Sequence, residues 1–152
     1  MELDELVARE AIRDLCARYA HAADRGHFGD LADLFADDGI FDMGTAAPVV
    51  GRPAIVAALT GVGDDLRDRT RVPTIRHHVS SISIVVDTPD EARAWSYFLA
   101  VTEHGPDHWG RYADRLVRER GRWRFAHRRV RTDGAAPGSW AEGRLGGVRE
   151  PD

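Results

Sequence analysis

The residues of this chain that could carry chemistry are an acid, two histidines, a phenol and an arginine, all placed inside the fold by apolar patterns. Tyr19 and Asp24 close a long helical pattern, His77 and His78 open an apolar strand pattern, and Arg128 stands in the last strand pattern. Burying such groups costs several kcal/mol unless they are paired. A pocket that brings them together would support acid–base chemistry, so we expect neither a cofactor nor a metal.

The acid and a histidine would work as a pair. An imidazole, with an ordinary pKa of about 6.5, can accept a proton near neutrality. A buried carboxylate that accepts its other N–H fixes the tautomer and stabilises the imidazolium that forms. Strand alternation favours His78 as the inward histidine, because it shares a face with Ile82 and Ile84.

A second group of polar residues could line the same pocket as substrate-binding side chains. We assign this role to Arg128, His78, Tyr112, Asp114 and Trp95. Three of them have a simpler alternative: Asp114 could pair with a neighbouring arginine, Arg128 could belong to a solvated strand end, and Trp95 could be core. Along the strand pattern at 92–103, Trp95 alternates with Tyr97, Leu99 and Val101, and we expect this face, with Trp109, to be core or pocket wall. Tyr19 could likewise be an amphipathic core tyrosine.

Several chemistries are excluded or disfavoured by composition. All 21 basic residues are arginine, which excludes a lysine Schiff base. Cys16 is the single cysteine, so no intrachain disulfide forms, and its place in the helical pattern predicts a core residue. His104 and His108 have metal-like spacing, but Gly105-Pro106 between them breaks any helix, and no zinc motif accompanies them.

The charge pattern argues against nucleic acid or a membrane as a partner. The net charge is −4, and no apolar run approaches the roughly 20 residues of a membrane span. The nine arginines between Arg111 and Arg131 are interpreted as a solvated or inter-subunit face. No signal peptide precedes the first helix, so we expect a cytoplasmic protein.

The elements that must position these residues are helices first and then long strands. The patterns predict helices at 4–23, 28–35 and 54–59, a loop or lid at 61–73, and strands at 40–43, 75–86, 92–103, 109–119 and 122–131. This order predicts an α+β fold with one curved sheet around the long helix. We expect one domain over residues 1–132 and a flexible tail over 133–152.

Three segments of the sequence resemble a known family. They are residues 19–39, residues 76–81, and residues 110–128 with their Tyr112/Asp114 and Trp123/Phe125 patterns. Together they resemble SnoaL-like proteins of the nuclear-transport-factor-2-like superfamily, in the branch of scytalone dehydratase, bile-acid 7α-dehydratase and hexachlorocyclohexane dehydrochlorinase. The resemblance implies a cone-shaped domain, with N-terminal helices packed on a strongly curved, mostly antiparallel sheet, and assembly as dimers or trimers.

The resemblance also implies roles for single residues. The family's catalytic aspartate matches Asp24. Its histidine matches His77, because the family usually has an asparagine four residues after this histidine, and that position is Ser81. Here the chain departs from the family pattern, with serine in place of asparagine. On this basis we prefer His77 to His78. Relatives place a polar residue at the position of Tyr19, and dehydrochlorinase-like relatives have a pocket arginine at that of Arg128.

The implied activity is a cofactor-independent lyase or isomerase acting on a small hydrophobic cyclic or polycyclic substrate. A polyketide-cyclase-type aldol enzyme would use the same Asp24 and differ in pocket shape. A non-catalytic ligand-binding module, or a ring-hydroxylating dioxygenase β-subunit, would keep the fold without needing Asp24 and a strand histidine. Co-purification with an iron-bearing α-subunit would favour the last of these.

Overall fold

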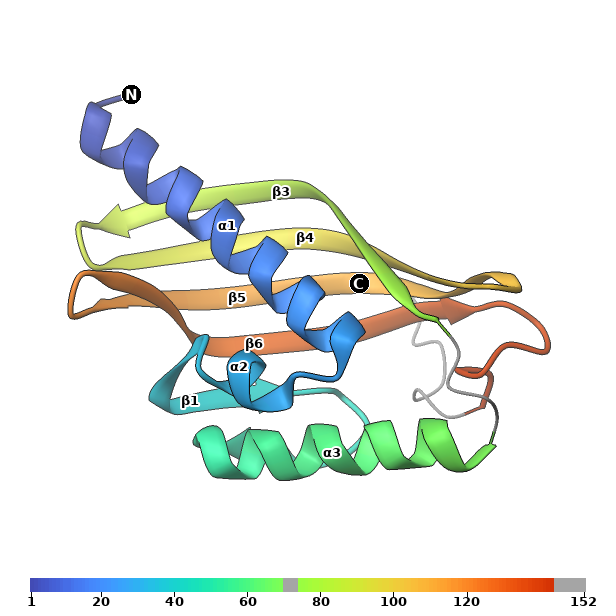
Figure 1. Cartoon of the computed structure of the whole chain (residues 1–152). Helices are drawn as coiled ribbons and strands as arrows, with labels where there is room; N and C mark the ends of the chain where they lie inside the picture. The colour runs from blue at the N-terminus through green and yellow to red at the C-terminus, as the bar shows by residue number, and fades with distance from the viewer. Residues whose placement is uncertain (70–73, 144–152) are drawn as a thin grey trace.

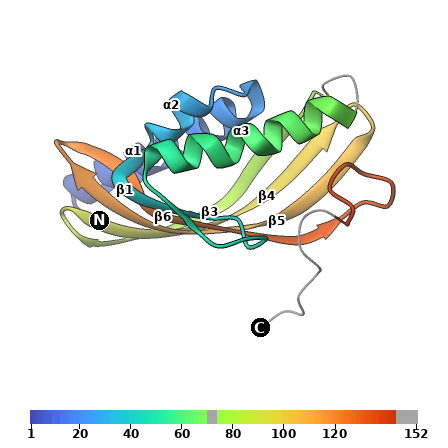
Figure 2. The same cartoon turned by 90° about the horizontal axis from the view of Figure 1, so that it is seen from below.

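Three helices lie against one face of a curved sheet in the computed structural model, which describes residues 1–69 and 74–143. In chain order the elements are α1 (Leu3–Arg25), α2 (Phe28–Ala32), β1 (Phe35–Asp42), β2 (Val49–Val50), α3 (Arg52–Arg69), β3 (Arg76–Thr88), β4 (Glu91–Thr102), β5 (Gly105–Glu119) and β6 (Arg122–Ala135). The sheet order is β2-β1-β6-β5-β4-β3, antiparallel except for β1 beside β6. Figure 1 shows α1 crossing the sheet diagonally, and Figure 2 shows the helices on one of its faces. The predicted α+β class is confirmed.

Helix α1 buries one side and stops where the candidate site begins. The side facing the sheet carries Ile12, Leu15, Cys16, Tyr19 and Ala20, all buried, as their helical spacing predicts. Gly26 adopts a left-handed conformation with φ 68°, and its N–H donates to the carbonyl of Ala23 at 3.1 Å. The N–H of His27 donates to the carbonyl of Ala22 at 3.0 Å, which completes a glycine-ended C-terminal cap. Asp24 is thereby held in the last turn of the helix.

An aromatic cluster fixes α1 over the middle of the sheet. It consists of Tyr19, Phe35, Phe41, Tyr112 and Phe125, all buried. The ring of Tyr19 meets those of Phe125 and Tyr112 edge-on, with centroids 5.8 and 5.9 Å apart. These contacts connect the helix to β6 and β5, so the end of α1 is set by packing against both strands.

Strand β3 contains a bulge that reverses which residues face the core. Ser80 pairs with Tyr97, but Ser83 pairs with Trp95, so β3 has one residue more than β4 over this stretch. Ser81 takes the extra place with a φ of 52°. Because successive strand residues point to opposite faces, one extra residue moves the inward set from odd to even numbers. His77 therefore points inward together with Ile82, although five positions separate them.

The bulge leads to a prediction about residue 81. A β-branched side chain is poorly tolerated at positive φ, so Ser81→Val should lower the free energy of unfolding by roughly 1–2 kcal/mol. Ser81→Gly should retain stability, because glycine adopts this conformation freely. Urea unfolding of both variants measures the difference. Equal stability of the two would contradict the bulge.

Two expected boundaries around the helices are wrong. The predicted helix 28–35 ends at Ala32, and Phe35 instead opens β1, where it pairs with Phe125 and joins the aromatic cluster. The predicted loop at 61–73 is helical as far as Arg69, because α3 continues through Gly61. A glycine in a helix costs only about 1 kcal/mol, which burial of Ile55 and Leu59 on the same helix outweighs. Residues 70–73 of that loop lie outside the described residues.

The last strand runs past the expected domain boundary at residue 132. It ends at Ala135, and the N–H of Ala136 then donates to the carbonyl of Asp107 at 2.8 Å. Ala141 is buried, so the described start of the predicted tail packs on the domain. Residues 144–152 of that tail lie outside the described residues.

Among the described helices, none has the length and apolar character needed to cross a membrane.

Candidate active site

Asp24 and His77 lie in direct contact between the end of α1 and the start of β3. Oδ1 of Asp24 is 2.6 Å from Nδ1 of His77, and the same carboxylate accepts the backbone N–H of His77 at 3.1–3.2 Å. The Asp24 side chain is 9% exposed and that of His77 is 18% exposed. The structure thus brings together the two residues that the resemblance pairs, while their catalytic role stays a prediction.

This placement of Asp24 is electrostatically unfavourable for the helix alone. The C-terminal end of a helix carries partial negative charge, so a carboxylate there costs about 0.3–1 kcal/mol. The three contacts with His77 compensate by giving the buried carboxylate its hydrogen bonds. Because a carboxylate can only accept, Nδ1 of His77 carries the proton, and Nε2 of the neutral ring is left as the basic nitrogen.

Tyr19 lies in the aromatic cluster and is 5% exposed. Burial raises the pKa of Tyr19 to about 12, an effect that the nearby Arg128 guanidinium partly offsets. Its phenol therefore stays protonated at ordinary pH and is available as a hydrogen-bond donor.

Arg128 and Asp114 form a buried ion pair beneath Tyr19. Nε and Nη2 of Arg128 donate to the two carboxylate oxygens of Asp114 at 2.9 and 2.7 Å. The guanidinium also lies 4.0–4.2 Å from the ring centroids of Phe125, Tyr19 and Tyr112. Burial by itself would lower the pKa of Arg128, but Asp114 raises it above its ordinary value, so the arginine is permanently charged. The expected pairing of Asp114 with an arginine is confirmed, and the solvated strand end is wrong for Arg128.

Tyr112 connects this ion pair to the part of the sheet that carries His77. It is 4% exposed, and its ring stacks on that of Phe98 with centroids 4.9 Å apart. The ring of Phe98 lies 6.2 Å from that of His77. Tyr112 therefore faces inward, as its alternation with Asp114 predicts.

Two predicted pocket residues face away from the helices. His78 is exposed because the bulge gives the inward position to His77. Trp95 is 42% exposed, whereas its neighbours Ala94 and Ser96 are buried on the helix side of β4. Both side chains therefore lie on the face of the sheet opposite to that of His77 and the helices. The predicted alternation in β4 is present, but the predicted buried face is the wrong one.

A further pair of residues at the site was not predicted as such. Nδ1 of His108 is 2.8 Å from Oδ2 of Asp107, both side chains are almost fully buried, and the ring centroids of His108 and His77 are 6.1 Å apart. The sequence contains a signal for the position of His108. Alternate residues of β5 point to the same face, so His108 and Gly110 lie on the inward face that also carries Tyr112 and Asp114. The metal-like spacing of His108 with His104 masks that signal.

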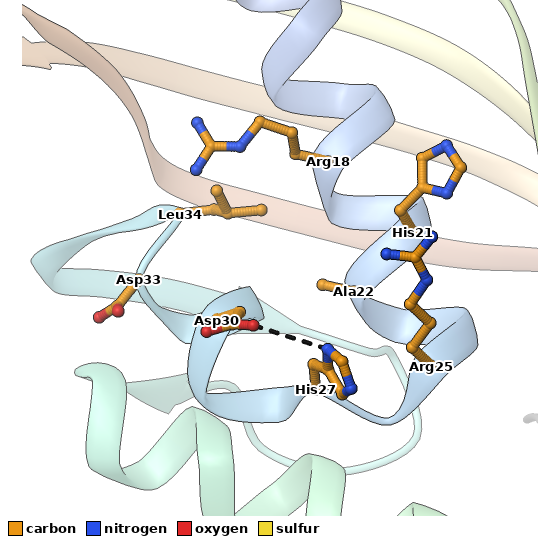
Figure 3. Close-up of a pocket in the computed structure, with 8 residues that line it drawn as sticks. All are labelled: Arg18, His21, Ala22, Arg25, His27, Asp30, Asp33 and Leu34. Carbon is orange, nitrogen blue, oxygen red and sulfur yellow. Dashed lines mark ion pairs between the residues drawn. The ribbon is translucent and has the colours of Figure 1, made fainter.

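A separate hollow of about 490 Å³ lies on the surface between α1 and α2 (Figure 3). Its lining includes Arg18, His21 and Arg25 of α1, and Nδ1 of His27 lies 3.6 Å from the carboxylate of Asp30, three residues further along the chain. These side chains are exposed, so water screens the interactions between their charges. We place the candidate site at Asp24 and His77, because buried paired groups are where acid–base chemistry is tuned.

Within residues 1–69 and 74–143, no three His, Cys, Asp or Glu side chains form a group suited to hold a metal.

Comparison with known proteins assigns the chain to a family. The sequence model described as "SnoaL-like domain" matches residues 4–129. A Novosphingobium aromaticivorans structure named "Putative Scytalone Dehydratase" is 29% identical with a TM-score of 0.77, over 90% of this chain and 91% of that one. A Catenulispora acidiphila protein in complex with S-DNPA is 30% identical with a TM-score of 0.72, over 84% and 95%.

The LinA structure shares the fold, with a TM-score of 0.75 and 21% identity over 90% of this chain and 94% of that one. No functionally curated protein matches this chain significantly. From the matched residues and the shared fold, the chain belongs to the SnoaL-like family of the nuclear-transport-factor-2-like superfamily.

Proposed function

We propose that this protein is a cofactor-independent lyase or isomerase that acts on a small cyclic or polycyclic substrate through Asp24 and His77. The observation that carries the proposal is the 2.6 Å contact between the Asp24 carboxylate and Nδ1 of His77. Membership of a family that includes dehydratases, isomerases and cyclases supports the same class of reaction.

The proposed chemistry begins at Nε2 of His77. This nitrogen removes a proton from a carbon next to a carbonyl or another activating group, and the C–H electron pair forms a double bond or an enolate. Asp24 stabilises the imidazolium that results. Loss of a leaving group such as hydroxide, which takes a proton to become water, completes an elimination, and return of the proton to another carbon completes an isomerisation.

Tyr19 and Arg128 support the charge that develops on the substrate. The Tyr19 phenol stays protonated, so it can donate to an oxyanion as one donor among several. Arg128 acts from beneath the rings of Tyr19 and Tyr112, where its charge is held by Asp114. Tyr112 and Phe98 provide aromatic surface beside His77, which favours a hydrophobic ring as substrate.

The test is a panel of substrates whose reactions begin with removal of a carbon-bound proton. Scytalone, hexachlorocyclohexane and a cyclic β,γ-unsaturated ketone cover dehydration, dehydrohalogenation and double-bond migration. We expect at least one to react, detected by absorbance of the conjugated product or by deuterium uptake from D₂O. A panel with neither product nor exchange would count against the proposed function. Co-purification with a dioxygenase α-subunit would indicate instead that the protein is a dioxygenase β-subunit.

We also propose that copies of the chain associate through the sheet face that the helices leave uncovered. Trp95, Tyr97 and Trp109 on this face are 41–60% exposed. Light scattering at micromolar concentration should give the mass of a dimer or trimer. Replacing Trp95 and Tyr97 by serine should shift that mass toward a single chain, and a wild-type monomer would contradict the association.

A further inference from the structure

A second carboxylate–imidazole pair lies beside the first and has no part in the chemistry described above. Asp107 and His108 are adjacent in β5, with Nδ1 of His108 2.8 Å from Oδ2 of Asp107. Their side chains are only 4% and 7% exposed, respectively. Two buried ionisable groups next to a candidate base are a costly arrangement, and this cost calls for a functional explanation.

The sheet register brings His108 and His77 to the same point. His77 of β3 and His108 of β5 both pair with Ala100 of β4, so the three side chains form one row on the helix side of the sheet. Two strand spacings separate the backbones of the histidines by about 9.6 Å. Their ring centroids are only 6.1 Å apart, so the rings lean toward each other over the small Ala100 side chain.

The two rings have similar hydrogen-bond partners and share one aromatic neighbour. Each donates its Nδ1 proton to a carboxylate, Asp24 for His77 and Asp107 for His108, so Nε2 is the basic nitrogen of both neutral rings. In the described part of the chain, no hydrogen bond to either Nε2 is found. The ring of Phe98 lies 6.2 Å from His77 and 5.7 Å from His108, and it forms one wall beside both.

The charged groups around His108 favour a single proton for the two rings. Burial lowers the pKa of His108, the hydrogen bond to Asp107 raises it in part, and the neighbouring His77 lowers it again. Asp24 of α1 is a further charged group next to the two histidines, because its carboxylate contacts His77. A proton on His77 therefore disfavours a second one on His108. An imidazolium with a lowered pKa is also a stronger acid, which suits it to donate a proton.

We propose that His108 is the proton donor of the site and that Asp107 is its positioning residue, an inference that rests on the function proposed above. His77 takes the proton from the substrate carbon. His108 receives it through a hydrogen-bonded water or substrate hydroxyl and delivers it to the leaving oxygen. The C–H and C–O bonds break, a C=C bond and an O–H bond form, and the two rings return to their starting state.

The C-terminal segment holds this second pair in place. The backbone N–H of Trp140 donates to Oδ1 of Asp107 at 2.9 Å, while Oδ2 accepts from His108. The ring of Trp140 lies 6.1 Å from that of His108. The segment after β6 therefore orients the donor, and its contribution to the site is separate from that of α1.

The first experiment measures the coupling of the two rings without any substrate. In ¹⁵N-histidine-labelled protein, long-range ¹H–¹⁵N spectra followed over pH should show His77 and His108 protonated at Nδ1 when neutral. His77→Gln should raise the titration midpoint of His108, and Asp107→Asn should lower it. His104→Gln, at an exposed turn, is the matched control and should leave it unchanged. A His108 midpoint that does not respond to His77→Gln overturns the shared proton.

The second experiment separates donation from abstraction on a panel substrate that loses water, because only such a substrate has a leaving oxygen to protonate. In D₂O, His108→Gln should keep deuterium exchange at the substrate carbon while elimination falls at least tenfold, whereas His77→Gln should lose both. Equal loss of exchange and elimination in folded His108→Gln protein overturns the donor role. Absence of both reactions in the wild type instead defeats the proposed function, and the titration then still decides whether the rings share a proton.

Discussion

Replacing His77 by glutamine should lower turnover of the reactive panel substrate at least a hundredfold, because general-base catalysis contributes roughly 10²–10⁴-fold. The backbone N–H of residue 77 still donates to the Asp24 carboxylate in this variant, so the contact between α1 and β3 should remain. The loss should appear in kcat as well as kcat/KM, since the base acts in the chemical step. Steady-state rates together with thermal unfolding of the variant measure both effects.

The neighbouring histidine provides the matched control. His78 is exposed on the opposite face, so His78→Gln should leave turnover unchanged. Asp24→Asn should be about as damaging as loss of His77, because an amide cannot stabilise the imidazolium. Tyr19→Phe should cost roughly ten- to a hundredfold, as one oxyanion donor among several. Loss of activity in His78→Gln alone would mean that the β3 register is wrong, and activity in both histidine variants would leave Asp24 as the candidate base.

The choice between these histidines shows what the sequence can and cannot specify. Alternation counted back from Ile82 gives His78, and the family pattern gives His77. The structure reconciles the two, because Ser81 occupies a bulge that shifts the alternation by one residue. A serine at positive φ carries no sequence signature as clear as glycine, so periodicity alone could not locate this bulge.

The order and type of α1 and of the long strands β3 to β6 were predictable because each has a strong period, whereas the end of α3 was predicted ten residues too early. Gly26 ends α1 in the left-handed conformation that glycine favours, so the helical pattern and this glycine together predict that Asp24 lies in the last turn. Short elements were less predictable, as at Phe35, where pairing with Phe125 overrode a helical pattern.

The predicted buried face of β4 is wrong for a physical reason. Period-two alternation separates two faces but does not say which one meets the helices. Trp95 and Tyr97 are the larger residues, and their hydrophobicity suggested burial. The face that meets the helices carries Ala94, Ser96 and Phe98, all buried, so the size of Trp95 and Tyr97 does not identify the inward face.

The buried ion pair should be the most stability-sensitive feature of the molecule. Arg128→Met should lower the free energy of unfolding by about 3–5 kcal/mol, because it leaves the Asp114 carboxylate buried without its partner. Asp114→Asn should be similarly damaging, since the guanidinium would lose its counter-charge. Urea unfolding followed by tryptophan fluorescence measures both. Arg93→Met, which breaks an exposed pair with Asp87, is the control and should leave the unfolding midpoint nearly unchanged.

The double variant decides what the pair is for. Arg128→Met with Asp114→Leu removes both charges together, so most of the lost stability should return, as it does when apolar residues of similar volume replace buried ion pairs. Turnover of the double variant should nevertheless stay low, because Tyr19 and Tyr112 would have lost the cation 4.1–4.2 Å from their rings. Full activity in the double variant would show that Arg128 serves the fold alone. If stability returns and activity does not, the charge of Arg128 is needed for the reaction.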